Sequence, residues 1–124
     1  YQTLNIMGND SKIYFVPYRG NFTRGIFTSI YMKFDDEIEN IKSIYKDFYE
    51  SHPFTFLSKN DINLKEVINT NNCHVNIECH ESIIHITTVI DNLLKGASGQ
   101  AVQNLNIIFG YEESLGLNFK GSIY

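Results

Sequence analysis

The architecture depends on one segment, Asn72-Cys73-His74-Val75-Asn76-Ile77-Glu78-Cys79-His80-Glu81-Ser82-Ile83-Ile84-His85-Ile86-Thr87-Thr88-Val89-Ile90. Residues 72–79 and 82–90 both alternate between apolar and polar side chains, which is the two-residue period of a β-strand. The few residues between the two runs suit the tight turn of a hairpin. The sequence therefore predicts an antiparallel strand pair in this segment.

Two further strands are expected in the first 34 residues. Residues 12–17 form a short apolar and β-branched run that ends on a proline, which cannot donate to a strand ladder. Residues 18–25 then have the composition of a loop. Residues 26–34 alternate again, and this pattern predicts a strand that is buried on both faces near its start.

An amphipathic helix is expected between these strands and the hairpin. Asp35-Asp36-Glu37 supplies capping and helix-dipole chemistry at its start, and His52-Pro53 ends it. Between them, apolar residues recur at helical spacing up to about Glu50. They are Ile38, Ile41, Ile44, Tyr45, Phe48 and Tyr49.

The remaining segments complete the expected fold. Residues 54–57 predict a short strand, and the polar stretch 58–72 holds at most one helical turn, around 64–68. An apolar stripe predicts a last helix over about 97–110, which begins after small residues and ends at a glycine. This order of elements favours an α+β domain whose sheet, largely antiparallel or mixed, is covered by helices.

Composition limits the possible classes of function. The chain has 124 residues, and its 14 acidic and 10 basic side chains are interleaved, so no basic stripe is available for nucleic acid. No apolar run approaches the roughly 20 residues of a membrane span, and no secretion signal is present. We therefore predict a soluble, cytoplasmic protein with reduced cysteines. The chain opens on Tyr1, and residues 4–8 resemble the last turn of a helix, so we expect a piece of a longer protein.

The hairpin carries residues that could bind a metal ion or act as nucleophiles. Cys73-His74 and Cys79-His80 offer thiolate and imidazole, but six residues of one strand span roughly 20 Å, too far for one ion. We predict no metal site and an inward face made of Cys73, Val75, Ile77 and Cys79, with His74 and His80 opposite. Neither cysteine lies where its pKa would be lowered, so neither is predicted to be a nucleophile, and His52 and His85 are assigned structural or surface roles.

The small residues before the last helix, Lys95-Gly96-Ala97-Ser98-Gly99-Gln100, have two interpretations. Free backbone N–H groups at a helix start can bind a phosphate, and Gly96 and Gly99 would let it approach closely. Alternatively, the glycines let the helix pack tightly against a neighbour. No dinucleotide or P-loop fingerprint decides between them.

A longer motif connects the chain to a known family. Asp91-Asn92-Leu93-Leu94-Lys95-Gly96-Ala97-Ser98-Gly99-Gln100-Ala101-Val102-Gln103-Asn104-Leu105-Asn106, followed by Phe109-Gly110 and Gly116-Leu117, closely resembles the C-terminal signature of N-acetyl-gamma-glutamyl-phosphate reductases. The segments Thr70-Asn71-Asn72-Cys73, Phe15-Val16-Pro17 and Thr23-Arg24-Gly25-Ile26 also resemble segments of this family. The resemblance covers nearly the whole chain, in order.

The resemblance implies an activity for a longer protein. That enzyme would reduce N-acetyl-glutamyl phosphate to the semialdehyde with NADPH, through a thioester on a cysteine upstream of this chain. Residues 1–124 would be the C-terminal substrate and dimerisation domain of a homodimer or tetramer. The helix at about 97–110 would return to an absent nucleotide-binding domain that holds most of the NADP site. The 124 residues alone would be inactive.

The resemblance also assigns roles to individual residues. Tyr18 occupies the position of the family's acid/base histidine, and a tyrosine donates a proton at neutral pH but is a poor base. Arg24 would bind a substrate carboxylate or phosphate, the alternative being a surface ion pair. The cofactor-binding residues would be Asn92, Lys95, Gly99 and Asn104. An aspartate-semialdehyde dehydrogenase relative and a non-catalytic oligomerisation module remain as alternatives.

Overall fold

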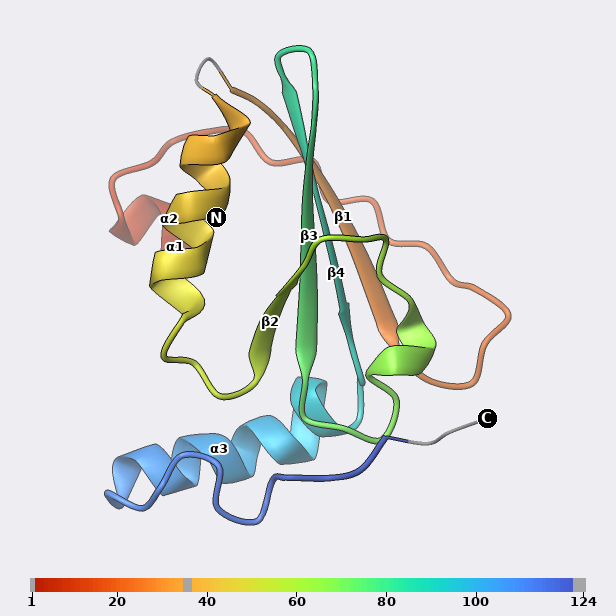
Figure 1. The fold of residues 1–124 in the computed structure, drawn as a ribbon, viewed down its shortest axis with the longest axis vertical. Helices are drawn as coiled ribbons and strands as arrows, with labels where there is room; N and C mark the ends of the chain where they lie inside the picture. The colour runs from red at the N-terminus through yellow and green to blue at the C-terminus, as the bar shows by residue number, and fades with distance from the viewer. Residues whose placement is uncertain (1, 35–36, 122–124) are drawn as a thin grey trace.

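A mixed four-stranded sheet forms the centre of the computed structural model, which describes residues 2–34 and 37–121 (Figure 1). Within these residues the strand order is β1 (Ile26–Lys33), β4 (Ile83–Ile90), β3 (Cys73–His80) and β2 (Thr55–Ser58). β3 and β4 form the predicted hairpin, with Glu81 in the left-handed region at φ +56° in the turn. β1 pairs antiparallel with β4, whereas β2 runs parallel to β3. The predicted α+β class with a largely antiparallel, mixed sheet is confirmed.

Helix α2 (Ile38–Tyr49) covers one side of the sheet, which we call the helix face. Its spacing of isoleucines brings Ile41 against a buried core completed by Val75, Ile77, Ile84 and Ile86. Asp35 and Asp36, two of the expected capping residues, lie outside the described residues, and Glu37 is the N-cap residue. The helix is confirmed in position, but of its six apolar residues only Ile41 is buried, and Ile44 and Phe48 are 63% exposed.

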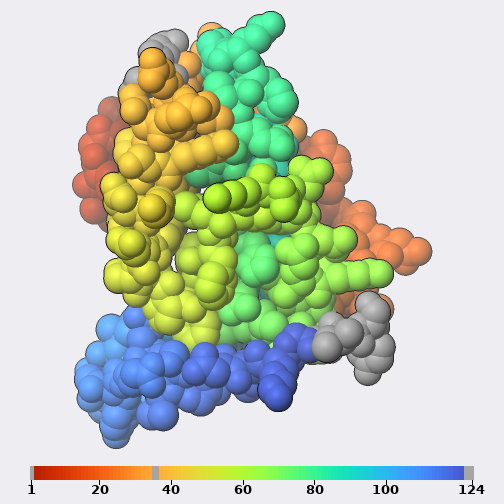
Figure 2. All heavy atoms as spheres, viewed as in Figure 1, coloured from red at the N-terminus to blue at the C-terminus, as the bar shows by residue number. Residues whose placement is uncertain are grey.

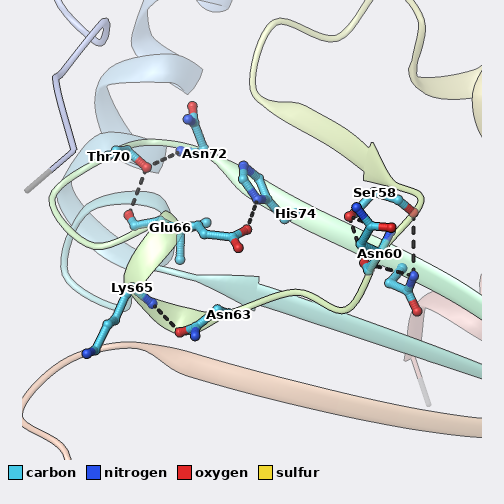
Figure 3. Close-up of polar contacts among 10 residues, drawn as sticks. Ser58, Asn60, Asn63, Lys65, Glu66, Thr70, Asn72 and His74 are labelled. Atoms are coloured by element: carbon cyan, nitrogen blue, oxygen red, sulfur yellow. Dashed lines mark hydrogen bonds and ion pairs between the residues drawn. The ribbon is translucent and has the colours of Figure 1, made fainter. Parts of the chain in front are cut away.

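The chain between β2 and β3 crosses the opposite side, which we call the crossover face. Parallel strands need such a crossover, and here it contains the short 3-10 helix η1 (Leu64–Glu66), near the predicted turn. Figure 3 shows how polar contacts fasten it to the sheet: His74 Nδ1 lies 3.1 Å from Glu66 Oε2, and the amide of Asn76 donates to the carbonyl of Asn60 at 3.1 Å. These contacts use the side of β3 predicted to point away from the core.

The C-terminal helix packs in an unexpected orientation. A wide turn, η2 (Leu94–Ser98), leads into α3 (Gly99–Ile108), and Gly110 follows at φ +70°, so the predicted helix is confirmed. Its buried side chains, however, are the polar Gln103 and Asn106. The apolar stripe is largely exposed, and its exposed members include Val102, Leu105, Ile108 and Phe109. In Figures 1 and 2, α3 forms one edge of the molecule.

Two expectations about the N-terminal quarter are wrong. Residues 12–17 form no strand, because they pair with no other strand of the described chain, and Tyr14 and Phe15 are 85% and 86% exposed. β1 is a strand, but it is not buried on both faces: Phe27 and Tyr31 are at least half exposed. The reason is that β1 is an edge strand, and α2 packs chiefly against β2 and β3.

The helical turn expected near the start is present as α1 (Gln2–Ile6), which ends at Gly8 with φ +74°. A positive φ favours glycine because a Cβ would clash there.

No helix in the described ranges 2–34 and 37–121 has the length and apolar character needed to span a bilayer.

Replacement of Ile84, which is fully buried, tests the position of the core. Ile84→Ala should lower the free energy of unfolding by about 2–5 kcal/mol, because it removes apolar contacts and leaves a cavity. Ile44→Ala, on the exposed side of α2, should change it by less than about 1 kcal/mol. Urea unfolding followed by circular dichroism measures both, and equal losses would contradict the core described above.

Candidate functional site

Two distant segments meet at one end of the sheet. Because β1 and β4 are antiparallel with Ile26 opposite Ile90, the residues just before β1 lie beside those just after β4. The backbone N–H of Gly25 donates to the side-chain carbonyl of Asn92 at 2.7 Å. Arg24 and Asn92, predicted to bind substrate and cofactor respectively, are thus brought together.

The carboxylate of Asp91 forms the centre of this end. It is fully buried, and Oδ1 accepts hydrogen bonds from the backbone N–H groups of Leu93 and Leu94 at 2.8 and 2.9 Å. Oδ2 accepts one from the N–H of Asn69 at 2.7 Å and lies 2.7 Å from Nε of Arg24. Burial alone would raise the pKa of Asp91, but the backbone hydrogen bonds and the Arg24 contact outweigh burial and lower this pKa. Asp91 is therefore held as an anion.

Arg24 makes an ion pair with the buried Asp91, which differs from the surface ion pair weighed against a substrate contact. The contact to Asp91 is close but not well aligned as a hydrogen bond, so it acts mainly through charge. The Arg24 side chain is 28% exposed. A guanidinium has five N–H donors in a fixed plane, so this ion pair orients the group without using all of its donors.

A second polar group surrounds Lys95. Its ammonium donates to the Gln103 carbonyl at 2.7 Å and lies 5.7 Å from the centre of the Phe54 ring. Gln103 in turn donates to Glu113 at 2.6 Å. Desolvation lowers the pKa of Lys95, against the opposing effect of Cys73 and Glu113. Lys95 is thus built into the packing between η2 and α3 rather than extended into solvent.

The turn before α3 has little capacity left for an added anion. The N–H groups of Leu93 and Leu94 are taken by Asp91, and those of Gly96, Ser98 and Gly99 by backbone carbonyls. A Cβ on Gly99 would lie 2.9 Å from the carbonyl oxygen of Leu94 and closer still to Asn71 Oδ1. Of the two interpretations of these small residues, the geometry favours close packing, with Asp91 in the place expected for a phosphate.

The remaining predicted residues lie outside these two groups. Tyr18 is 89% exposed in the segment before β1, and Asn104 is on the exposed side of α3, where its side-chain carbonyl accepts from Gln100 at 3.2 Å. Burial raises the pKa of the Cys73 thiol, against the opposing effect of Lys95, which favours the neutral thiol over a nucleophilic thiolate.

Sequence reasoning overlooked the most connected residue of the site. Asp91 was quoted only as part of a motif, yet an aspartate directly before a helical segment is a recognisable capping signal. Its contact with Asn69 could not be read from the sequence, because that residue comes from the crossover. Gln103 was also missed, because the apolar stripe of α3 was taken as the helix's defining face.

Asp91→Asn tests the electrostatic role of the buried carboxylate. At pH 7 the variant should lose about 2–3 kcal/mol of unfolding free energy, because a charge-assisted contact to Arg24 and three hydrogen bonds to an anion are weakened. Since the folded-state pKa is lowered, this contribution is present above the unfolded value of about 3.9 and is lost as pH falls through the folded value.

The difference between wild type and Asp91→Asn should therefore shrink below about pH 4. Urea unfolding at pH 7, 4 and 3 measures it, with the exposed Asp61→Asn as the control. A difference that stays constant across this range would mean that folding does not lower the pKa of Asp91.

Gly99→Ala and Gly96→Ala form a matched pair that tests close packing. The added methyl at Gly99 should cost about 1–3 kcal/mol, because it meets backbone and side-chain oxygens. At Gly96 the nearest atoms are 3.6 Å away, so alanine should be neutral or stabilise by up to about 1 kcal/mol. Thermal unfolding of both variants gives the comparison, and equal effects would argue against a packing role for Gly99.

Comparisons with known proteins place the chain among relatives. Residues 1–92 match the family model described as semialdehyde dehydrogenase, dimerisation domain. The chain is 53% identical over 121 residues to the N-acetyl-gamma-glutamyl-phosphate reductase of Karelsulcia muelleri, covering 96% of this chain and 37% of that protein. The proteins of the same name from Christiangramia forsetii and Parabacteroides distasonis are 51% and 46% identical over 114 residues, covering 92% of this chain and 36% and 35% of those proteins.

The chain thus spans a little over a third of the length of these curated relatives. The family match, by contrast, covers most of the chain described here. It includes Arg24, Asp91, helix α2, the crossover and all four strands of the described sheet. Because the match extends over this whole architecture, the chain belongs to the semialdehyde dehydrogenase dimerisation-domain family.

Proposed function

We propose that residues 1–124 are the C-terminal substrate and dimerisation domain of an NADP-dependent N-acetyl-gamma-glutamyl-phosphate reductase. The whole enzyme would reduce N-acetyl-glutamyl 5-phosphate to N-acetyl-glutamate 5-semialdehyde in arginine biosynthesis, in the cytoplasm. The names and identities of the relatives support this assignment over an aspartate-semialdehyde dehydrogenase. The chain alone would be inactive, since the nucleophile and most of the NADP site would belong to the rest of the enzyme.

The observation that carries the proposal is the ion pair between Arg24 and the buried Asp91. A guanidinium that is fixed on its Nε side can present its remaining N–H donors as a preformed fork for a phosphate or carboxylate. The substrate, an acyl phosphate that also carries a carboxylate, offers both groups. Arg24 would therefore position substrate, and Asp91 would hold Arg24 in place.

Tyr18 would be the residue that donates a proton to the developing alkoxide of the semialdehyde. It is exposed, so the phenol is accessible to a substrate held between this domain and the rest of the enzyme. Tyrosine is a weaker base than histidine, so we expect it to serve the reductive direction better than the reverse.

NADPH would supply the hydride, and few residues here suit contact with it. The backbone N–H groups before α3 are largely occupied, so they offer no phosphate cradle. Asn104 lies beside the exposed apolar stripe of α3, which would pack against the nucleotide-binding domain, so its amide is best placed for a cofactor contact. The turn before α3 sets the direction of this helix, and its shape would be the contribution of Asn92, Lys95 and Gly99.

The exposed edge strand supports homo-oligomer formation, as a dimer or tetramer. Phe27, Ile30 and Tyr31 present apolar surface on both faces of β1, and large exposed apolar patches mark interaction sites.

The acidic balance of charge argues against a nucleic-acid partner. A non-catalytic oligomerisation module is the second candidate, favoured by the tyrosine at position 18.

The test is phosphate-requiring, NADP-dependent oxidation of N-acetyl-glutamate semialdehyde by the intact protein. Arg24→Lys should lower kcat/KM by about 100-fold, because lysine cannot keep the bidentate fork, a loss of roughly 2–3 kcal/mol. Arg19→Lys, in the same loop and exposed, should change kcat/KM by less than about twofold.

Tyr18→His distinguishes the two candidates. If the parent and the histidine variant both turn over, the reductase assignment holds and Tyr18 supports catalysis. If only Tyr18→His is active, in the reductive direction with acyl phosphate and NADPH as well as in the oxidative one, the protein is a repurposed relative. If neither is active while the protein still forms a homo-oligomer, the oligomerisation module is the better description.

A further inference from the structure

Three ligating side chains gather at the end of the sheet opposite Asp91, beside the turn of the hairpin. They are Glu78 and His80 of β3 and His85 of β4. Glu78 is paired directly with His85 in the antiparallel register, and His80 follows Glu78 by two residues, so all three project from the crossover face. Cys73 and Cys79 lie on the helix face and take no part.

The two distances from Glu78 to the histidines are close to those between neighbouring ligands of a tetrahedral ion. Oε2 of Glu78 lies 3.5 Å from His80 Nε2 and 3.7 Å from His85 Nδ1, and the three atoms lie within 4.8 Å of one another. These contacts are too long for good hydrogen bonds. Zinc bonds of about 2.0–2.2 Å, arranged tetrahedrally, separate neighbouring ligand atoms by roughly 3.3–3.6 Å.

Neighbouring residues of β1 orient His85 for this role. Ser29 Oγ lies 2.8 Å from Nε2 of His85, and the Tyr31 ring stacks on the imidazole with centroids 4.4 Å apart and planes 2° apart. A metal-binding histidine usually hydrogen-bonds through its second ring nitrogen, which fixes the tautomer and the ring direction. Here the hydrogen bond to Ser29 leaves Nδ1 directed at Glu78.

We propose that Glu78, His80 and His85 bind a divalent transition-metal ion, zinc being the best match. Two imidazoles and one carboxylate suit zinc better than calcium or magnesium, which prefer oxygen ligands. The side chain of His85 is 19% exposed, that of Glu78 40% and that of His80 70%, so water can complete the coordination. The ion would fasten β3 to β4 beside their turn, far from the arginine site.

Metal titration of the intact protein, after removal of metals with EDTA, tests the proposal. Calorimetry with Zn²⁺ and the visible spectrum of Co²⁺ should reveal one ion in the wild type that is lost, or bound at least about 10-fold more weakly, in Glu78→Gln, His80→Gln and His85→Gln. Ser29→Ala should lower the affinity for the same ion by about 10-fold while leaving all three ligands in place.

His74→Gln is the matched control. His74 lies on the same strand and the same face as His80 and also has a glutamate neighbour, Glu66 at 3.1 Å, but it is outside the cluster. Its substitution should leave zinc binding unchanged. Circular dichroism of each variant shows that it is folded, and His80→Gln, at the most exposed ligand, is least able to disturb the fold.

Two results would overturn the proposal. One is a wild-type protein that binds no zinc or cobalt beyond what the three cluster variants bind. The other is an equal loss of affinity in His74→Gln, which would show non-specific binding by surface histidines.

Discussion

A buried carboxylate needs several strong partners, and satisfying Asp91 determines how one end of this domain is assembled. An unpaired charge in the interior is unfavourable by several kcal/mol, so its hydrogen bonds and its cation must all be in place. At Asp91 they come from three parts of the chain: Asn69 of the crossover, Arg24 before β1, and the turn that leads into α3. The carboxylate thus ties together segments that the sheet alone would only bring near one another.

The same arrangement explains why the orientation of α3 differs from that of an ordinary surface helix. Its inward side is polar: Asn106 donates to the carbonyls of Glu113 and Leu115 at 3.1 and 2.9 Å, and Gln103 connects Lys95 to Glu113. Hydrogen bonds fasten the helix to its own domain, which leaves the apolar stripe available for another surface. A helix with a polar inner face and an exposed apolar face is suited to connect two domains, in agreement with the proposed place of this chain in a larger enzyme.

Much of the fold could be predicted because it follows local periodicity. In the hairpin, the alternate spacing of Val75 and Ile77 predicts which side of the strand is buried, and in α2 Ile41 belongs to a helical spacing of apolar residues. All three residues pack in the core. Periodicity does not say whether a strand finds a partner, which is why residues 12–17 were misassigned and the burial of β1 was overestimated.

The sites were harder to foresee, because they depend on register. Arg24 and Asn92 were proposed as site residues from a family resemblance, whereas Asp91 makes its contacts across the fold. The pairing of Glu78 with His85 likewise requires the alignment of two strands. A metal site sought along a single strand was set aside on distance, whereas the proposed cluster uses one residue from the neighbouring strand.

The position of β1 in the sheet also has a consequence for folding during synthesis on the ribosome. Within the described sheet its neighbour is β4, and even the nearest pair, Lys33 and Ile83, is separated by 50 residues (83 minus 33). At typical rates of synthesis the strand Ile26-Phe27-Thr28-Ser29-Ile30-Tyr31-Met32-Lys33, with a single charge, waits roughly 3–10 s for that neighbour to leave the ribosome. During this time its apolar, β-prone sequence is open to pairing with other nascent chains. The strength of the finished core does not protect the strand during this interval, because that core has not yet formed.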